Sequence, residues 1–149
     1  MTCIFCQIVR GDVAAGIVFE DGETLAFLDH RPLFPGHCLL IPRVHVETLV
    51  EVPAPLLAQL SSNARSLAIA MEKALGAQGA FVAINNRVSQ SVPHVHVHVV
   101  PRTKGDGLKG FFWPRQKYRD PEHMGEVRGV VERAMKEMAE GDKQVGRSR

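Results

Sequence analysis

The sequence has little that is typical of a secreted, membrane-spanning or nucleic-acid-coating protein. Only three of its 149 residues are cysteines, too few for a disulfide framework. No apolar run approaches the roughly 20 residues that span a bilayer, and the N-terminus lacks the basic and apolar zones of a signal peptide. The formal net charge of +2 argues against general nucleic-acid binding. We therefore expect a cytoplasmic protein with no membrane partner, whose cysteines are thiols or metal ligands.

The composition is that of an ordinary globular domain. Apolar residues make up 45% and charged residues 23% of the chain, whose length suits one domain with a substantial core. Apolar runs bounded by turn residues predict strands, and two periodic apolar stripes predict helices. The expected strands are 17–20, 24–28, 37–41, 80–85 and 93–101, and the expected helices are 54–75 and the segment from Pro121 onward.

These elements predict an α+β fold. Short connections favour an antiparallel sheet of about five strands with two main helices over a parallel sheet. We expect the domain to occupy residues 1–140. The polar residues 141–149 predict a flexible C-terminal tail.

Three histidines alternate with valines in the last expected strand, at His94, His96 and His98. Side chains on a strand alternate between faces, so the valines would face the core and the histidines a cleft or polar surface. Neutral imidazole is both a nucleophile and an acid–base group near pH 7, and it can attack phosphorus. The row therefore indicates phosphate chemistry. A metal site or a surface run without chemistry is the alternative.

The segment around these histidines resembles the signature of the histidine triad family. Gln90–Val100 contains His-x-His-x-His followed by two apolar residues. Further matches occur in order at Ala26–Asp29, Pro35–His37 and Leu40–His45. The resemblance covers about residues 3–102. Ser89 stands where many relatives have a glycine, so the phosphate contacts of the loop before the triad are an open question.

The resemblance implies a HIT-like fold and a nucleotide hydrolase or transferase that needs no metal for its chemical step. His96 would be the nucleophile that becomes nucleotidylated, and His98 would contact the α-phosphate. The resemblance implies an adenine-containing nucleotide as the substrate and a homodimer as the assembly. Within this family a hydrolase of dinucleoside polyphosphates or nucleoside phosphoramidates is the expected activity. The alternatives are a nucleotidyltransferase or phosphorylase, and a nucleotide-binding regulatory protein with little turnover.

The resemblance also implies a set of nucleotide-binding residues. Asp29 would hold the ribose hydroxyls, and Asn85, Gln90 and Ser91 would contact phosphate or leaving-group atoms. The base would lie among apolar side chains, with candidates at Phe5, Ile8, Phe27 and Leu28. Each residue has a structural alternative: a turn cap for Asp29, local backbone or loop contacts for the three other polar residues, and plain core packing for the apolar ones. His37 could orient the site or be structural.

Cys3 and Cys6 have the spacing of half a zinc site, although a redox pair uses the same spacing. Some zinc-containing members of the resembling family complete such a site with residues that correspond here to His45 and His94. The resemblance therefore implies a structural Cys₂His₂ zinc site, which would remove His94 from the chemistry. Buried thiols and a helix-start histidine are the alternative.

The segment 102–119 is rich in glycine, basic residues and aromatic residues, and it predicts an exposed loop. Because it follows the histidine strand, it could hold a polyphosphate or a second base by charge and stacking. A solvated loop whose aromatic residues pack on a partner subunit is the alternative. The residues concerned are Arg102, Lys104, Lys109, Arg115, Lys117, Arg119, Phe111, Phe112, Trp113 and Tyr118.

Overall fold

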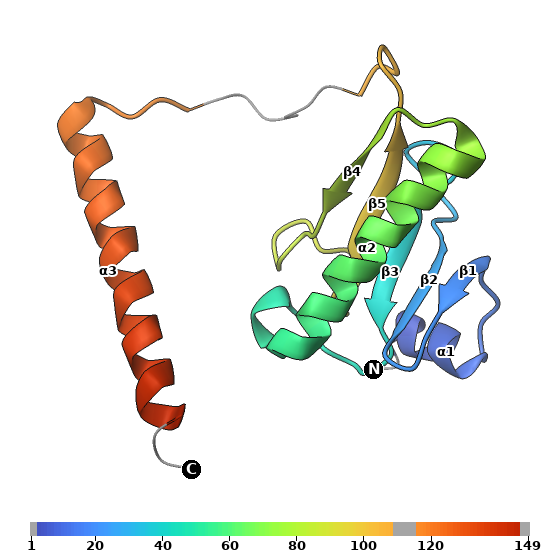
Figure 1. Cartoon of the computed structure of the whole chain (residues 1–149), viewed down its shortest axis with the longest axis horizontal. Helices are drawn as coiled ribbons and strands as arrows, with labels where there is room; N and C mark the ends of the chain where they lie inside the picture. Colours follow the sequence, from blue (N-terminus) through green and yellow to red (C-terminus); the bar gives the residue numbers. More distant parts are fainter. Residues whose placement is uncertain (1–2, 109–115, 147–149) are drawn as a thin grey trace. The chain divides into compact units, whose positions relative to one another are not determined.

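The structure of the chain is a computed structural model that describes residues 3–108 and 116–146. It contains two units, residues 1–108 and residues 109–149, and each is described by itself. The first unit holds all the strands and the helices α1 and α2, and the second holds α3 (Figure 1). No helix of the described residues has both the length and the apolar character needed to cross a membrane.

The first unit is built on one antiparallel sheet. Its strand order is β1-β2-β3-β5-β4, so β1 and β4 form the edges. The predicted α+β fold with a five-stranded antiparallel sheet is therefore confirmed. The strands are β1 (Ile17–Glu20), β2 (Thr24–Leu28), β3 (Cys38–Pro42), β4 (Gly79–Ala83) and β5 (Val97–Arg102).

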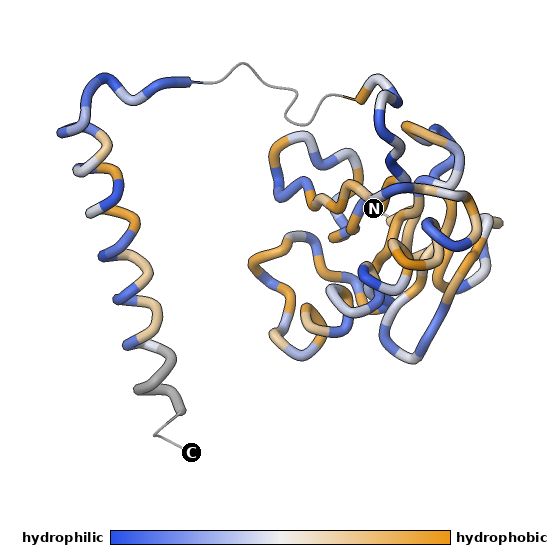
Figure 2. Tube along the Cα trace, turned by 45° about the horizontal axis from the view of Figure 1, so that its top comes forward, coloured by the Kyte–Doolittle hydropathy of each residue, from blue (hydrophilic) through white to orange (hydrophobic). Residues whose placement is uncertain are grey.

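The sheet buries a different cluster on each face, as strand alternation requires. Figure 2 shows that apolar residues are concentrated in its strands. One face carries Ala26, Leu40 and Val99 and packs against α2. The other carries Leu25, Phe27, Leu39 and Ile41 and packs against Phe5 and Ile8 of α1. The candidate site lies on this second face.

Helix α2 spans Ala54–Leu75, the range that the sequence predicts. Its apolar stripe is buried from Leu56 to Met71. The helix ends at Gly76, whose φ of 66° is a left-handed conformation that glycine adopts without strain. Asn63 joins the helix to the sheet by donating to Asp21 at 2.7 Å and to Thr24 at 2.8 Å.

Helix α1, Ile4–Arg10, is missing from the sequence prediction. At seven residues it is too short to show a stripe over several turns, which is why periodicity does not reveal it. Two local signals exist: Phe5 and Ile8 are spaced to share a face, and Gly11 ends the helix with a φ of 81°.

The last strand begins later than predicted, at Val97 rather than at Pro93. In the segment before β5, two histidine side chains donate hydrogen bonds to backbone carbonyls. His94 Nε2 bonds Pro42 O at 2.8 Å, and His96 Nδ1 bonds His94 O at 2.8 Å. Pro42 also has no N–H to donate to a ladder. His94 and His96 therefore lie in a non-strand segment, and only His98 lies on β5.

The second unit contains α3, Pro121–Gly146. Asp120 caps it by accepting the His123 N–H at 2.7 Å. The helix continues to Gly146 and so extends into the segment 141–149 that the sequence predicts as a tail. The large apolar side chains of one helix face are exposed in this unit: Met124, Val127, Val131, Met135 and Met138.

Candidate active site and metal centre

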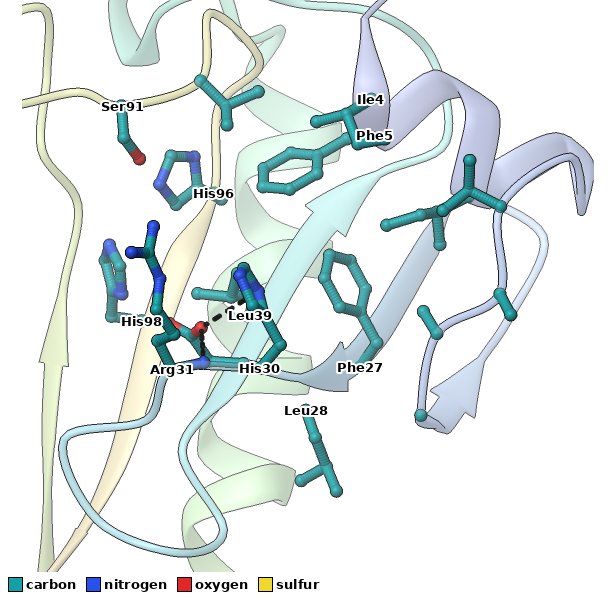
Figure 3. A pocket seen from close by; sticks show the side chains of 17 residues that line it. Ile4, Phe5, Phe27, Leu28, His30, Arg31, Leu39, Ser91, His96 and His98 are labelled. Atoms are coloured by element: carbon teal, nitrogen blue, oxygen red, sulfur yellow. Dashed lines mark hydrogen bonds and ion pairs between the residues drawn. The ribbon is translucent and has the colours of Figure 1, made fainter.

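A pocket of about 660 Å³ lies between α1 and the second face of the sheet. Figure 3 shows Ser91, His96 and His98 on one side of it, and Phe5 and Phe27 on the other. Of the apolar candidates, Phe5, Ile8, Phe27 and Leu28 all line the pocket. One wall is thus apolar and the opposite wall carries imidazole and hydroxyl groups.

The hydrogen bond of His96 assigns its tautomer. Nδ1 bonds the backbone carbonyl of His94 at 2.8 Å, and because a carbonyl only accepts, Nδ1 carries the proton. In the neutral ring the lone pair is then on the other nitrogen, Nε2. The ring is 3% exposed and touches Phe5 edge-on with centroids 5.3 Å apart. His96 is therefore a buried ring at the pocket wall, held in one orientation by the bond from Nδ1 to the His94 carbonyl.

A second chain of hydrogen bonds assigns the tautomer of His98. Leu33 donates its backbone N–H to His37 Nδ1 at 3.2 Å, so His37 carries its proton on Nε2. That Nε2–H donates to His98 Nδ1 at 3.0 Å. His98 must then carry its proton on Nε2, and this buried atom has no partner among the described residues. His98 thus holds an unused N–H donor, with its ring centroid 4.9 Å from that of His96.

Burial keeps both histidines of this chain neutral. Desolvation, followed by repulsion from His96 and His37, lowers the pKa of His98 to about 4, against a smaller opposing effect of Asp29. Burial likewise lowers the pKa of His37, and Asp29 partly opposes it. Near pH 7 both rings are therefore uncharged, as the hydrogen-bond assignment requires.

Asp29 and Arg31 lie in the loop after β2 and both line the pocket. Asp29 Oδ1 accepts the Arg31 backbone N–H at 2.9 Å, so the turn-capping role is present. The second oxygen, Oδ2, lies 3.8 Å from His37 Nδ1. One carboxylate oxygen therefore shapes the loop and the other remains able to accept from a ligand.

The polar candidates before the histidines differ in whether they line the pocket. Ser91 lines the pocket, whereas Asn85 and Gln90 do not. Gln90 is used within its own loop: its amide nitrogen donates to Glu47 O at 2.6 Å, and its oxygen accepts the Arg87 N–H at 2.8 Å. Its position thus matches the alternative of a loop contact. Arg87 and Ser89 have φ values of 66° and 61°, so this loop is tightly turned.

Cys3, Cys6, His45 and His94 come together from three segments, with one ligand atom of each within 4.8 Å of the others. His94 Nδ1 lies 3.4 Å from Cys3 Sγ and 3.7 Å from Cys6 Sγ, and His45 Nδ1 lies 3.4 Å from Cys6 Sγ. Tetrahedral zinc with Zn–S near 2.3 Å and Zn–N near 2.0 Å separates its ligands by about 3.3–3.8 Å. The spacing therefore fits a Cys₂His₂ site.

The hydrogen bond of His94 supports the same fit. Its Nε2 donates to Pro42 O at 2.8 Å, which leaves the lone pair of Nδ1 directed at the two thiols. His94 is fully buried and does not line the pocket. The structure thus separates the three histidines as the resemblance implies, with His94 among possible metal ligands and the other two at the pocket.

Sequence reasoning missed some residues of the site. Ile4, Arg31, Leu39 and Val92 line the pocket without having been candidates. The place of Ile4 in the pocket depends on helix α1, which the sequence did not predict. The place of Leu39 depends on its pairing with His98 between β3 and β5. His37, for which two roles were open, is placed by its bond to His98 as an orienting residue. Of the loop 102–119, residues 109–115 lie outside the described residues. Arg102 is bound by Asp106 at 2.6 Å.

The comparisons with known proteins identify the relatives of this chain. The model of the HIT domain family matches residues 10–105. A relative in Schizosaccharomyces pombe, an adenosine 5′-monophosphoramidase, is 35% identical over 76% of this chain and 84% of its own. An adenylylsulfatase of Arabidopsis thaliana is 36% identical over 71% of this chain and 55% of its own length. A zinc-bound histidine triad protein of Mycobacterium smegmatis superposes with a TM-score of 0.71 at 39% identity, covering 77% of this chain and 85% of that one.

Proposed function

The chain belongs to the histidine triad (HIT) family, and from this membership and the geometry of the pocket we propose that it hydrolyses nucleotides through a nucleotidyl-histidine intermediate. One observation carries the proposal: an unprotonated nitrogen of His96 and an unused N–H of His98 line the same pocket. The two relatives named for activities on adenylyl compounds support an adenine nucleotide as the substrate.

The proposed reaction has two steps. His96 Nε2 attacks the α-phosphorus, and the bond to the leaving group breaks with its electron pair going to that group. Water then attacks the phosphorus, the P–N bond breaks with its electron pair returning to His96 Nε2, and the water gives up a proton to solvent, which releases the nucleoside monophosphate and restores the neutral histidine. The carbonyl of His94, bonded to His96 Nδ1–H, stabilises the positive charge that develops on the ring. His98 Nε2–H donates to a non-bridging oxygen where negative charge builds up.

The remaining candidates have roles in binding. Asp29 accepts a ribose hydroxyl with Oδ2, and the Ser91 hydroxyl donates to a phosphate oxygen. Stacking and burial of the base against Phe5, Phe27 and their apolar neighbours Ile8 and Leu28 fix its position. A phosphate contact by Asn85 stays a prediction, and Gln90 acts by holding its loop.

We also propose that Cys3, Cys6, His45 and His94 hold a structural zinc ion. Support comes from the ligand spacing, from the orientation of His94 by Pro42, and from the zinc-bound relative. Such an ion would supply no chemistry to the reaction. It would join α1, which forms the apolar wall, to the segment that carries His96.

A homodimer is the proposed assembly. The edge strand β4 carries Val82, which is 50% exposed, beside an apolar groove of about 550 Å³ against α2. Uncovered edge strands are ready to pair with another chain. A second copy of this chain would cover the strand and the groove together.

A His96→Ala variant tests the proposed function. It should bind AMP within about twofold of the wild type, because the base and ribose contacts remain, and it should lose turnover by about 10³-fold or more. Unchanged turnover would refute the mechanism. Addition of inorganic phosphate separates the enzyme classes: a hydrolase releases only the monophosphate, and a phosphorylase forms a nucleoside diphosphate. A regulatory protein would bind AMP and show no turnover even as the wild type.

A further inference from the structure

Arg31 is the one lysine or arginine among the residues that line the described pocket. Its backbone is fixed by the bond from its N–H to Asp29 Oδ1 at 2.9 Å. In the view of Figure 3 its side chain extends from the loop after β2 toward the side that holds His96, His98 and Ser91. Its guanidinium makes no hydrogen bond or ion pair with the described residues, although most other arginines of the first unit do, as Arg10, Arg43 and Arg102 illustrate.

The charges around the pocket leave Arg31 without a counterion. Asp29 is the single carboxylate in the lining, and its oxygens lie toward Arg31 N and His37 rather than the guanidinium. His98 is neutral near pH 7 because its pKa is lowered to about 4, mainly by burial. In the proposed function two neutral donors serve the α-phosphate, the unpaired His98 Nε2–H and the Ser91 hydroxyl of the pocket lining. A guanidinium with five N–H donors then remains for a second anion.

We propose that Arg31 binds an anionic leaving group, so that the enzyme prefers nucleotides whose α-phosphate is joined to a sulfate or a further phosphate over those joined to an amine. This inference rests on the proposed function and names its substrate class. A sulfate or phosphate leaves as a stable anion when the P–O bond breaks and takes the electron pair without a proton. An amine must gain a proton as the P–N bond breaks. A fixed cation therefore assists the first kind of leaving group and offers nothing to the second.

The test compares adenosine 5′-phosphosulfate with adenosine 5′-phosphoramidate, which share the adenylyl part and differ in the leaving group. Arg31→Gln should lower kcat/KM for the phosphosulfate at least about tenfold, the effect of losing one charge-assisted hydrogen bond. The same variant should change kcat/KM for the phosphoramidate less than about twofold. Arg31→Lys, which keeps the charge, should recover part of the loss. Arg128→Gln removes the same charge from α3 and should alter neither substrate.

An equal loss on both substrates would overturn the inference, because Arg31 would then act on the shared α-phosphate or on the fold. No loss on either would overturn it too. Binding gives a readout that does not depend on turnover: the wild type should bind ADP more tightly than AMP, and Arg31→Gln should bind the two equally. If the wild type hydrolyses neither substrate, the proposed function fails, and the ADP-to-AMP ratio alone decides on Arg31. A wild-type ratio of one contradicts its role.

Discussion

Three histidines of the site have an assigned ring proton, His96 on Nδ1 and both His37 and His98 on Nε2, and two backbone groups set these assignments. The His94 carbonyl fixes His96, and the Leu33 N–H fixes His37, which in turn fixes His98. A neutral imidazole can hold its proton on either nitrogen, so these contacts select the form that suits the reaction. His37 is therefore a positioning residue that acts through His98.

Replacing His37 should expose this indirect role. His37→Leu removes the donor to His98 Nδ1, so that His98 can also hold its proton on Nδ1 instead of Nε2. We therefore expect kcat to fall at least about tenfold while KM changes less than about threefold. His37→Gln restores an N–H donor near the position of Nε2 and should recover much of kcat. Steady-state kinetics of the two variants decide the matter. A loss of equal size in both, with a lowered melting temperature, would indicate a merely structural role.

The neutral state of His98 also predicts how stability depends on pH. Its pKa of about 4 in the folded chain lies below the ordinary 6.5, so the unfolded chain takes up the proton first as the pH falls. The stabilisation is complete above about pH 6.5 and is lost as the pH falls toward 4, by at most about 3 kcal/mol. Burial is the main cause of this lowered pKa; of the groups that face the ring, His96 and His37 lower it further and Asp29 opposes them.

Urea unfolding at about pH 7, 5.5 and 4.5 measures how the free energy of unfolding changes across this pH range. His98→Asn keeps an acceptor for His37 and cannot take up a proton. Its free energy of unfolding should fall less steeply with pH than that of the wild type. Equal slopes for the two proteins would contradict the assigned neutral state of His98.

Among the elements, α1 links the proposed metal ligands to the pocket. Its first turn carries Cys6 beside Phe5, and Phe5 contacts His94 and His96 with ring centroids 5.8 and 5.3 Å apart. A helix of seven residues is marginal alone, so it depends on packing and on its ligands. Loss of the metal should therefore loosen the apolar wall.

Cys3→Ser should lower the zinc content from about one ion per chain to near zero, and it should weaken AMP binding at least about threefold. Elemental analysis of protein purified without added zinc and calorimetric titration with AMP provide the two readouts. Cys38→Ala is the control: it removes a buried thiol of β3 that is not a proposed ligand, and this variant should retain the zinc content of the wild type. Full metal content in Cys3→Ser would exclude this ligand set. Metal loss with unchanged AMP affinity would exclude the coupling.

How far the sequence predicts the fold depends on the length of each element. Helix α2 has six buried residues along its stripe, and its bounds are predicted without error. Helix α1 has only about two turns, too few for an apolar period to show. Strand β5 starts late because the His94 and His96 side chains bond to backbone carbonyls, and an apolar pattern does not reveal such bonds. Arg31 was missed because a loop arginine has no pattern. Its place in the pocket follows only from the turn that Asp29 caps.

For the whole molecule, the proposed dimer gives a prediction about the exposed edge strand β4. We expect a homodimer by light scattering with size-exclusion chromatography. Val82→Glu places a charge on the exposed edge of β4 and should give a monomer. Val88→Glu is the matched control, because Val88 is 82% exposed and does not line the groove. A dimer that tolerates Val82→Glu would show that another surface forms it.

The central claim is that His96 becomes covalently nucleotidylated. The most direct test is intact-protein mass spectrometry of samples quenched in acid-free denaturant during turnover of an adenylyl substrate, followed by peptide mapping. The account predicts one adenylyl group per chain, attached to His96 and missing from His96→Ala. Turnover without any adduct, or an adduct on a different residue that persists in His96→Ala, would contradict the account.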